Sequence, residues 1–444
     1  MPKHPAELHP PGPVLEIVKD LETAGFQAWC VGGAVRDALL GHVHLDWDLA
    51  TDATPDQVRS IFGRKRTIPV GIEFGTVGIL DEAGVLHEIT TFRRDVRTDG
   101  RHAEVEFGAS LDEDLARRDF TVNAIAYSPS QRRLHDPFDG QRDIQARIIR
   151  AVGEPADRMR EDRLRALRAI RFAARFGFAI DPKTLDAIRD SATHLTRLSA
   201  ERVRQEIEKT MEQVQAPSKA LKLWISSGAA AVLLPEIAAN GGGGSGISDE
   251  VLAALDCSAL PGLAGKPGRK LARLAVLFSD VASGKALQAA TRLRFSKHEA
   301  QWIAAIVHRW QLVGAAMAQQ LRHGEPDSKS IRRWVAAIGR TQLSAFFRLA
   351  SARWSARRNA GEEAPTARAV HSLYRRTIRV SLSEPVDLRD LAVDGDDLRE
   401  AGITPGPELG KILSALLERV LDDPGMNVRA RLLDEARRLQ SGRT

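Results

Sequence analysis

Two adjacent glycines, Gly32 and Gly33, precede a pair of aspartates, Asp46 and Asp48, that are separated only by Trp47. Glycine lets backbone N–H groups approach a ligand closely, and a helix N-terminus attracts anions. Because side chains alternate along a strand, two aspartates at this spacing would point the same way while Trp47 faces the core. A phosphate cradle beside paired carboxylates is what a metal-dependent phosphate-transfer site requires. The alternative interpretation of the aspartates is a solvated turn.

A third carboxylate and an arginine strengthen this interpretation. Glu88 stands in an alternating run at 86–91 that predicts a strand able to pair beside the first two acids. Arg36 can neutralise a phosphate. Carboxylates with few histidines favour Mg²⁺, which binds through one or two carboxylates plus substrate phosphates. We therefore predict Mg²⁺ held by Asp46 and Asp48, because two such ions could activate an attacking hydroxyl and stabilise leaving pyrophosphate.

A second polar group follows at Arg117, Arg118, Asp119 and Asn123. Paired arginines ahead of a strand or helix start could clamp a triphosphate. Asp119 or Asn123 could then read ribose hydroxyls. Structural ion pairing is the alternative for these residues.

Four charged residues recur at every third position of a helix predicted over 158–171: Asp162, Arg165, Arg168 and Arg171. Cytosine and adenine present an exocyclic NH₂ donor beside a ring-nitrogen acceptor, whereas uracil and guanine invert that order. A carboxylate acceptor beside a guanidinium donor, Asp162 beside Arg165, therefore suits C and A. Mismatched buried polar groups cost about 1–3 kcal/mol each. The alternative is a solvated basic face with an ordinary Asp162–Arg165 pair within the helix.

The elements that must position these residues are of two kinds. Residues 14–145 mix helix and strand patterns, and strands are predicted at 76–80, 85–91, 103–107 and 120–127. From about residue 146, helical periodicity continues almost to the end of the chain. We expect an α/β catalytic head followed by all-α neck, body and tail domains, at 14–145, 146–215, 216–355 and 356–444.

Composition bounds the class of protein. The 444 residues are 43% hydrophobic and 27% charged, which is typical of a globular protein, and the net charge of +6 favours a polyanionic partner such as nucleic acid. Two cysteines leave no disulfide framework or cysteine metal site. Without a signal core or a long apolar run, we expect a cytoplasmic protein with no membrane partner. The glycine-rich segment 241–246 is interpreted as a flexible loop.

Four motifs, in this order, resemble the bacterial and eukaryotic-type CCA-adding tRNA nucleotidyltransferases, which share a superfamily with bacterial poly(A) polymerases. They are Gly32-Gly33-Ala34-Val35-Arg36-Asp37, Leu45-Asp46-Trp47-Asp48-Leu49-Ala50-Thr51, Arg117-Arg118-Asp119-Phe120-Thr121-Val122-Asn123-Ala124 and Asp136-Pro137-Phe138-Asp139-Gly140. The resemblance implies a head of the polymerase-β-like nucleotidyltransferase type. It also implies template-independent addition of CCA to the 3′ end of tRNA from CTP and ATP, with release of pyrophosphate.

The resemblance also assigns roles to residues of this chain. Asp46 and Asp48 match the metal ligands, and Glu88 matches the third catalytic carboxylate. Nucleotide contacts are implied for Gly33, Arg36, Arg118, Arg168 and Arg171, and base selection for Asp162 and Arg165. The segment 95–107 resembles the flexible loop of complete CCA-adding enzymes, which favours addition of the terminal A.

Other functions on the same scaffold remain open at this point. One is a poly(A) polymerase, another an enzyme that adds only the A, and a third a non-catalytic RNA-binding protein. The expected partners are the tRNA 3′ end, CTP and ATP, with no DNA, in a monomer or a homodimer. Eight arginines could line an RNA surface in the C-terminal half or simply form solvated faces: Arg332, Arg333, Arg353, Arg357, Arg358, Arg375, Arg376 and Arg379.

Overall fold

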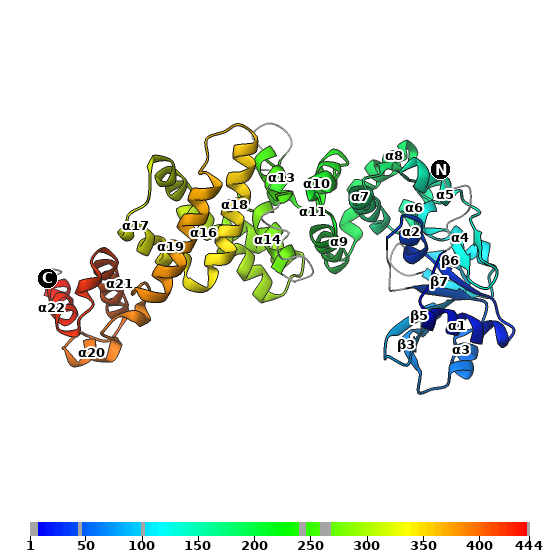
Figure 1. Ribbon diagram of the computed structural model, residues 1–444, viewed down its shortest axis with the longest axis horizontal. Coiled ribbons are helices and arrows are strands. Elements are labelled where there is room, and N and C mark those ends of the chain that lie inside the picture. The colour runs from blue at the N-terminus through cyan, green and yellow to red at the C-terminus, as the bar shows by residue number, and fades with distance from the viewer. Residues whose placement is uncertain (1–7, 43–46, 99–102, 239–245, 258–267, 442–444) are drawn as a thin grey trace. The chain divides into compact units, whose positions relative to one another are not determined.

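The computed structural model describes residues 8–42, 47–98, 103–238, 246–257 and 268–441. The chain forms two compact units, residues 1–234 and 235–444. The first unit contains the sheet and the helices around it, and the second is helical throughout its described part (Figure 1). The finer division into head, neck, body and tail stays a prediction.

A seven-stranded mixed sheet in the order β3-β4-β5-β2-β1-β8-β9 forms the centre of the head. Its strands are β1 Ala28–Val31, β2 Asp48–Thr51, β3 Thr67–Gly71, β4 Thr76–Leu80, β5 Leu86–Thr91, β8 Ala126–Ser128 and β9 Arg133–His135. The β2–β5 pair is parallel and the other neighbours are antiparallel. The predicted strand beside the aspartates is thus confirmed.

The helices of the head are short, and two of them begin with a capping box. The helices are α1 Gly12–Thr23, α2 Gly33–Leu39, α3 Pro55–Phe62, α4 Leu111–Ala116 and α5 Gly140–Ala146. Thr54 and Gln57 form a reciprocal capping box at the start of α3. Apolar residues from the strands and α4, among them Trp29, Val31 and Leu115, pack into one buried cluster. This core holds β1 and β2, the central strands at whose ends the candidate site lies.

Two sequence expectations about the head are corrected. The run 120–127 is only partly a strand, because Phe120 makes an isolated bridge to Ala151, Thr121–Asn123 is a 3-10 helix (η2), and β8 starts at Ala126. The expected flexible loop 95–107 contains most of a two-stranded pair, β6 Arg93–Thr98 with β7 Ala103–Phe107. The residues between those strands lie outside the described part of the chain.

The remainder of the first unit is helical, apart from the paired strands β10 Ile148–Ile149 and β11 Ala179–Ile180. Its helices are α6 Pro155–Glu161, α7 Leu164–Phe176, α8 Pro182–Ser191, α9 Ala200–Gln213, α10 Pro217–Ser226 and α11 Ala229–Leu233. The apolar stripe Leu164, Leu167 and Ile170 of α7 is buried, as its spacing predicts. In Figure 1, α7 and α9 lie side by side, and the two helices pack against each other.

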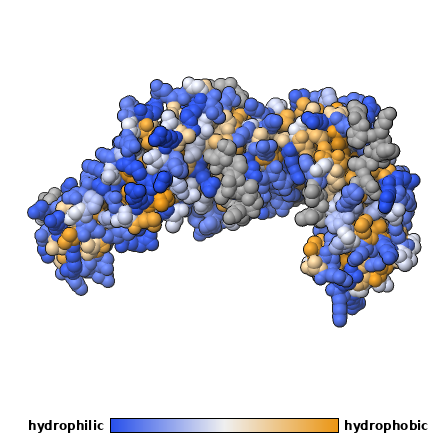
Figure 2. All heavy atoms as spheres, viewed as in Figure 1, coloured by the Kyte–Doolittle hydropathy of each residue, from blue (hydrophilic) through white to orange (hydrophobic). Residues whose placement is uncertain are grey.

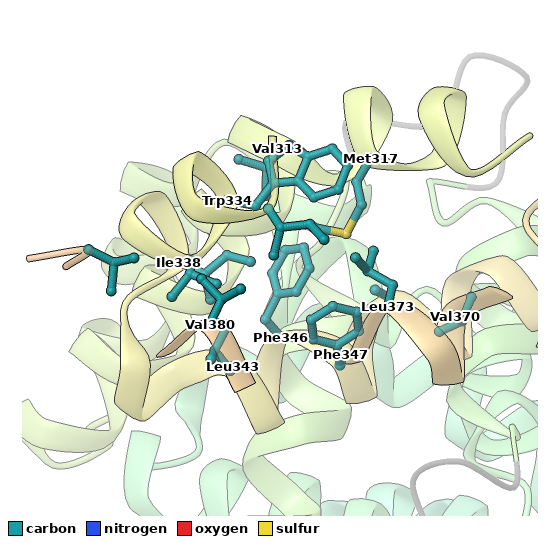
Figure 3. Packing of buried hydrophobic residues seen from close by; sticks show 14 of the residues in the cluster. Val313, Met317, Trp334, Ile338, Leu343, Phe346, Phe347, Val370, Leu373 and Val380 are labelled. Atoms are coloured by element: carbon teal, nitrogen blue, oxygen red, sulfur yellow. The ribbon is translucent and has the colours of Figure 1, made fainter. Parts of the chain in front are cut away.

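Apolar clusters join the helices of the second unit. Its helices are α12 Pro235–Ala238, α13 Asp249–Leu255, α14 Gly268–Leu277, α15 Ser283–Arg292, α16 Lys297–His323, α17 Ser328–Ile338, α18 Leu343–Asn359, α19 Ala367–Ser383, α20 Gly395–Glu400, α21 Pro407–Asp422 and α22 Arg429–Ser441. Side chains of α16 to α19, such as Met317, Trp334 and Phe346, converge in the larger cluster (Figure 3). A smaller cluster around Leu398 and Leu416 joins α20, α21 and α22.

The visible surface is mainly hydrophilic (Figure 2), which agrees with the 27% of charged residues in the sequence. Hydrophilic residues dominate the visible face of each unit, and apolar side chains are scattered among them (Figure 2). Within the described ranges, no helix combines the length and the apolar character that crossing a membrane requires.

Candidate active site

One cleft of about 410 Å³ in the first unit brings together most of the residues that the sequence singled out. Its volume is in the range of small-ligand sites. The lining consists of Gly32, Gly33, Arg36, Asp48, Arg117, Arg118, Asp119, Asn123, Asp162, Leu164, Arg165, Arg168, Phe172 and Arg202. Six arginines against three aspartates make this lining cationic, which suits a polyphosphate.

A cavity of similar size, about 430 Å³, lies in the second unit between α18 and α19. Its lining includes Arg348, Arg358, His371 and Tyr374 but no carboxylate among the described residues. The cleft of the first unit combines the glycine turn, a carboxylate and the arginines, so the candidate active site is placed there.

Gly32 is the residue that lets the backbone, an arginine and an aspartate meet at the end of β1. It has φ +75° and ψ −133°, a conformation that is strained for any residue with a side chain. A Cβ at Gly32 would lie 3.0 Å from the Arg118 Nη1 and 3.7 Å from the Asp48 Oδ2. Gly33, the first residue of α2, is less crowded, since its Cβ would meet the Arg36 Nη2 at 3.5 Å.

The carboxylates lie along two parallel neighbouring strands. Asp48 is the exposed first residue of β2, and Trp47 before it is buried, as predicted. Leu49 pairs with Ile89, so continuing the register back by one residue puts Asp48 beside the half-buried Glu88 on the same face. Glu88 does not line the cleft. Asp46 lies outside the described residues, and its predicted role stays a prediction.

The donor types here fit a hard divalent cation. Asp48 points its carboxylate at the space that a Cβ on Gly32 would crowd, and Glu88 lies beside it on the next strand. Carboxylate oxygens are the ligands that Mg²⁺ takes from proteins, often one or two per ion. Within the described part of the chain, no group of three or more metal-ligating side chains occurs, so a complete protein cage is not formed by these residues alone.

A chain of hydrogen bonds joins four predicted residues from three elements. The Arg36 Nη1 donates to the Asn123 Oδ1, and the Asn123 Nδ2 donates to the Asp119 Oδ1 at 2.8 Å. Arg168 on α7 donates from Nε and Nη2 to the Asp119 Oδ2 at 2.8 and 2.6 Å. Burial opposes ionisation of Asp119, but Arg168 and the Asn123 amide outweigh it, so the pKa of this carboxyl lies below its usual value. The structure thus contains the ion pairing that the sequence left as an alternative.

Arg36 is held in place from several sides. It is buried, it donates from Nε and Nη2 to the Asp37 Oδ1 at 2.8 and 2.6 Å, and its guanidinium lies 5.1 and 4.6 Å from the rings of Phe172 and Phe176. Burial lowers the pKa of Arg36, and the Asp37 charge opposes that effect. Arginine nevertheless stays protonated in proteins. Arg36 therefore supplies a fixed positive charge to the cleft.

Arg117 and Arg118 follow α4 and share one buried carboxylate. The Arg118 Nη2 donates to the Asp114 Oδ2 at 3.1 Å, and the Arg117 Nη1 lies 3.8 Å from the Asp114 Oδ1. The Arg118 Nε is buried without a hydrogen-bond partner in the part of the chain that the structure describes. Buried donors are nearly always satisfied in native proteins, so this atom is suited to an acceptor on a bound ligand.

The predicted continuous helix over 158–171 is wrong. It is interrupted between α6 and α7, where Asp162 has an extended backbone (φ −146°, ψ 106°). The Asp162 Oδ1 accepts from the backbone N of Leu164 at 3.0 Å, near the start of α7. Aspartate favours such capping over a helix interior, because its short side chain competes for backbone N–H groups.

The ordinary Asp162–Arg165 pair within one helix, which the sequence left as the alternative to base selection, is not formed. The Asp162 Oδ2 instead accepts from the Arg202 Nη2 on α9 at 2.7 Å. The Arg165 Nη1 donates to the Glu161 Oε2 at 2.7 Å, and its Nη2 donates to the Arg117 carbonyl at 3.0 Å. Asp162, in the break between the helices, and Arg165, in the first turn of α7, nevertheless both line the cleft.

Of the residues in 162–171 that are predicted to contact the nucleotide, Arg171 does not line the cleft. Its side chain is buried, and its Nε donates to the buried Glu206 Oε2 on α9 at 2.6 Å. Burial lowers the pKa of Arg171, and Glu206 opposes that effect. The pair joins α7 to α9, and neither of its residues lines the cleft.

Sequence reasoning missed three cleft residues, Leu164, Phe172 and Arg202. Phe172 stands four positions after Arg168, a helical spacing that places both on one face and could have identified it. Arg202 carried no such local signal, because its partner Asp162 is 40 residues away.

The structure separates the eight arginines of the predicted RNA surface into two groups. Arg332, Arg333, Arg353, Arg357 and Arg376 each form an ion pair with a nearby carboxylate. Arg358, Arg375 and Arg379 have no acidic partner among the residues described, and Arg358 donates to the Pro365 carbonyl. Helices α18 and α19, which carry these three, contain no Asp or Glu.

Three family models match consecutive parts of the chain. They are the poly A polymerase head domain over 28–150, the RNA- and SrmB-binding site of polymerase A over 177–240, and tRNA nucleotidyltransferase domain 2 over 272–436.

Several similar proteins and solved structures are named CCA-adding enzymes. The CCA-adding enzyme of Lactiplantibacillus plantarum is 34% identical over 450 residues, which cover 98% of this chain and 97% of the relative. That of Limosilactobacillus reuteri is 44% identical over 229 residues, and here the chain spans only about half of the relative, 54%. The structure of the Bacillus stearothermophilus CCA-adding enzyme in complex with CTP is 31% identical and superposes with a TM-score of 0.73, covering 97% of this chain and 98% of that one.

A more distant structure shows the same fold. It is the Thermotoga maritima CCA-adding enzyme complexed with tRNA, at 21% identity and a TM-score of 0.62 over 95% of this chain and 93% of that one. The order of the domains, the full-length relative and the superposition agree. The chain belongs to the CCA-adding enzyme family, with a nucleotidyltransferase head of the polymerase-β-like type followed by helical domains.

Proposed function

We propose that this protein adds C, C and A to the 3′ end of tRNA from CTP and ATP, without a nucleic-acid template and with release of pyrophosphate. The observation that carries the proposal is the cleft whose lining includes the glycine turn, Asp48, the arginines, and both Asp162 and Arg165. Family membership and the CTP complex of the B. stearothermophilus relative support it.

The reacting end of the cleft is taken as the start of β2, where Asp48 lines it. Asp46 and Asp48 would hold divalent cations, taken as Mg²⁺, which when bound would activate the tRNA 3′ hydroxyl and stabilise the leaving pyrophosphate. Glu88 is assigned as the third catalytic carboxylate, because the strand register puts it beside Asp48. The hydroxyl oxygen bonds to the α-phosphorus as the bond to the β-phosphate oxygen breaks.

Three arginines of the cleft are assigned to binding the triphosphate of CTP or ATP. Arg118 offers a buried Nε donor beside Gly32, and Arg36 carries a charge fixed by Asp37 and two rings. Arg168 faces the same cleft from α7. Asp119 and Asn123 are assigned as positioning residues for Arg36 and Arg168, since their side-chain groups already bond to those arginines.

Base selection is assigned to Asp162 and Arg165. Each oxygen of Asp162 accepts one hydrogen bond and keeps a second lone pair. Arg165 has five N–H groups, and the bonds that its Nη1 and Nη2 already donate do not use all of them. Asp162 and Arg165 can therefore both form further hydrogen bonds to a base edge. A base with the inverted donor order would leave these groups unpaired.

An incorporation assay tests the proposal. tRNAs that end before, within and after the CCA sequence are offered with labelled CTP and ATP. We expect C, C and A to be added until CCA is complete, and no addition to a finished end. Asp48→Asn should abolish incorporation while the protein stays folded. A long A-tail would identify a poly(A) polymerase, and incorporation of A without C would identify an A-adding enzyme; either result would overturn the proposal.

A further inference from the structure

Asp162 is bound at both carboxylate oxygens by two different helices. Its Oδ1 accepts from the backbone N of Leu164 at 3.0 Å on α7, and its Oδ2 accepts from the Arg202 Nη2 at 2.7 Å on α9. A carboxylate that is held at one oxygen can still turn about its Cβ–Cγ bond, because this torsion is broad. The second bond, from Arg202, removes that freedom.

Arg202 is presented to Asp162 from a rigid base. It lies in the first turn of α9, whose N-cap Ser199 accepts from the Arg202 backbone N at 3.4 Å. Val203 and Ile207 of the same helix are buried. The buried Arg171–Glu206 pair ties α9 to α7, so the Arg202 guanidinium has little freedom to move relative to α7, whose first residue donates to Asp162.

Arg202 also lies where a nucleotide would be read. Its side chain is one-third exposed and lines the cleft together with Asp162 and Arg165. Discrimination between C or A and U or G requires an acceptor and a donor at a fixed separation and orientation, since a rotated carboxylate presents its lone pairs elsewhere. A planar guanidinium is well suited to fixing that plane.

We propose that Arg202 is a specificity-determining positioning residue, which orients the Asp162 carboxylate so that it accepts from the exocyclic amine of C or A. The inference rests on the proposed function. It assigns Arg202 a role in the choice of nucleotide, whereas the phosphates are left to the other arginines of the cleft.

The experiment compares the full-length wild type with Arg202→Ala, Arg202→Lys, Asp162→Ala and the double variant Asp162→Ala/Arg202→Ala. The control is Arg204→Ala. Arg204 is on the same helix but does not line the cleft, and its Nε lies 3.9 Å from the Glu208 Oε2. kcat and KM are measured separately for CTP and UTP on a tRNA lacking its CCA end. Thermal melting is recorded for every variant.

We expect Arg202→Ala to lower the ratio of kcat/KM for CTP to that for UTP by about tenfold, the order expected for one lost charge-assisted hydrogen bond. Arg202→Lys should restore part of the ratio, and Arg204→Ala should keep it. If Arg202 acts through Asp162, the double variant should lose no more selectivity than Asp162→Ala alone.

Several results would overturn the inference. One is an unchanged ratio in a folded Arg202→Ala protein; another is an equal loss for CTP and UTP, which would indicate a phosphate contact or a purely structural role. Additive losses in the double variant would also contradict it. If Arg202→Ala does not fold, the same ratio of kcat/KM for CTP to that for UTP is measured for Arg202→Gln, which keeps most of the side chain. An unchanged ratio in that variant would then overturn the inference. A wild type that adds no C would refute the proposed function itself, and this inference with it.

Discussion

Replacing Gly32 by alanine separates two effects that this residue combines. The backbone conformation, φ +75° and ψ −133°, costs a residue with a side chain about 1–3 kcal/mol of stability. The new Cβ would also lie 3.0 Å from the Arg118 Nη1, so the guanidinium must shift. A displacement of about 1 Å in a catalytic group can cost about a hundredfold in rate. We expect Gly32→Ala to lose about 1–3 kcal/mol of unfolding free energy and about 10- to 100-fold in kcat/KM for CTP.

Two other glycines provide the comparison. Gly25 has φ +91° with nothing within 4 Å of its Cβ position, so Gly25→Ala should lose similar stability and keep full activity. Gly33 begins α2 without a positive φ, and Gly33→Ala should gain up to about 1 kcal/mol. Urea unfolding and incorporation kinetics give the two quantities. If Gly32→Ala keeps its kcat/KM, or Gly33→Ala destabilises as much as Gly32→Ala, the reasoning about crowding and backbone is refuted.

Two further predictions concern ion pairs. Glu206→Gln leaves Arg171 charged and buried without its counter-ion, so the free energy of unfolding, measured with urea, should fall by about 3–5 kcal/mol. Glu208→Gln, the control, should lower it by less than about 1 kcal/mol. Equal losses in the two variants would contradict the role given to the buried pair. The pKa of Asp119 is lowered in the folded state, so its ionisation adds stability above the ordinary aspartate pKa, and that contribution is lost as pH falls through the lowered pKa. Asp119→Asn should therefore be less stable than the wild type near pH 7, and the difference should shrink in acid; a difference that does not change with pH would refute the assignment.

The sequence by itself determined the features that depend on neighbouring residues. The glycine turn before α2, the alternating β5 strand and the apolar stripe of α7 follow from local periodicity and from glycine's backbone freedom, and the structure contains all three. The order of the motifs also indicated the nucleotidyltransferase head and the helical remainder.

The tertiary structure decided how the charged residues are paired. Equal spacing along 158–171 predicted one helix, with an internal Asp162–Arg165 pair as the alternative to base selection, but Asp162 lies between α6 and α7 and bonds to Arg202, 40 residues away. Arg171 bonds to Glu206, 35 residues away, and does not line the cleft. A charge pattern shows which side chains share a face of a helix. It does not show which distant carboxylate or guanidinium the fold brings within 3 Å, because those contacts exist only after the helices have packed.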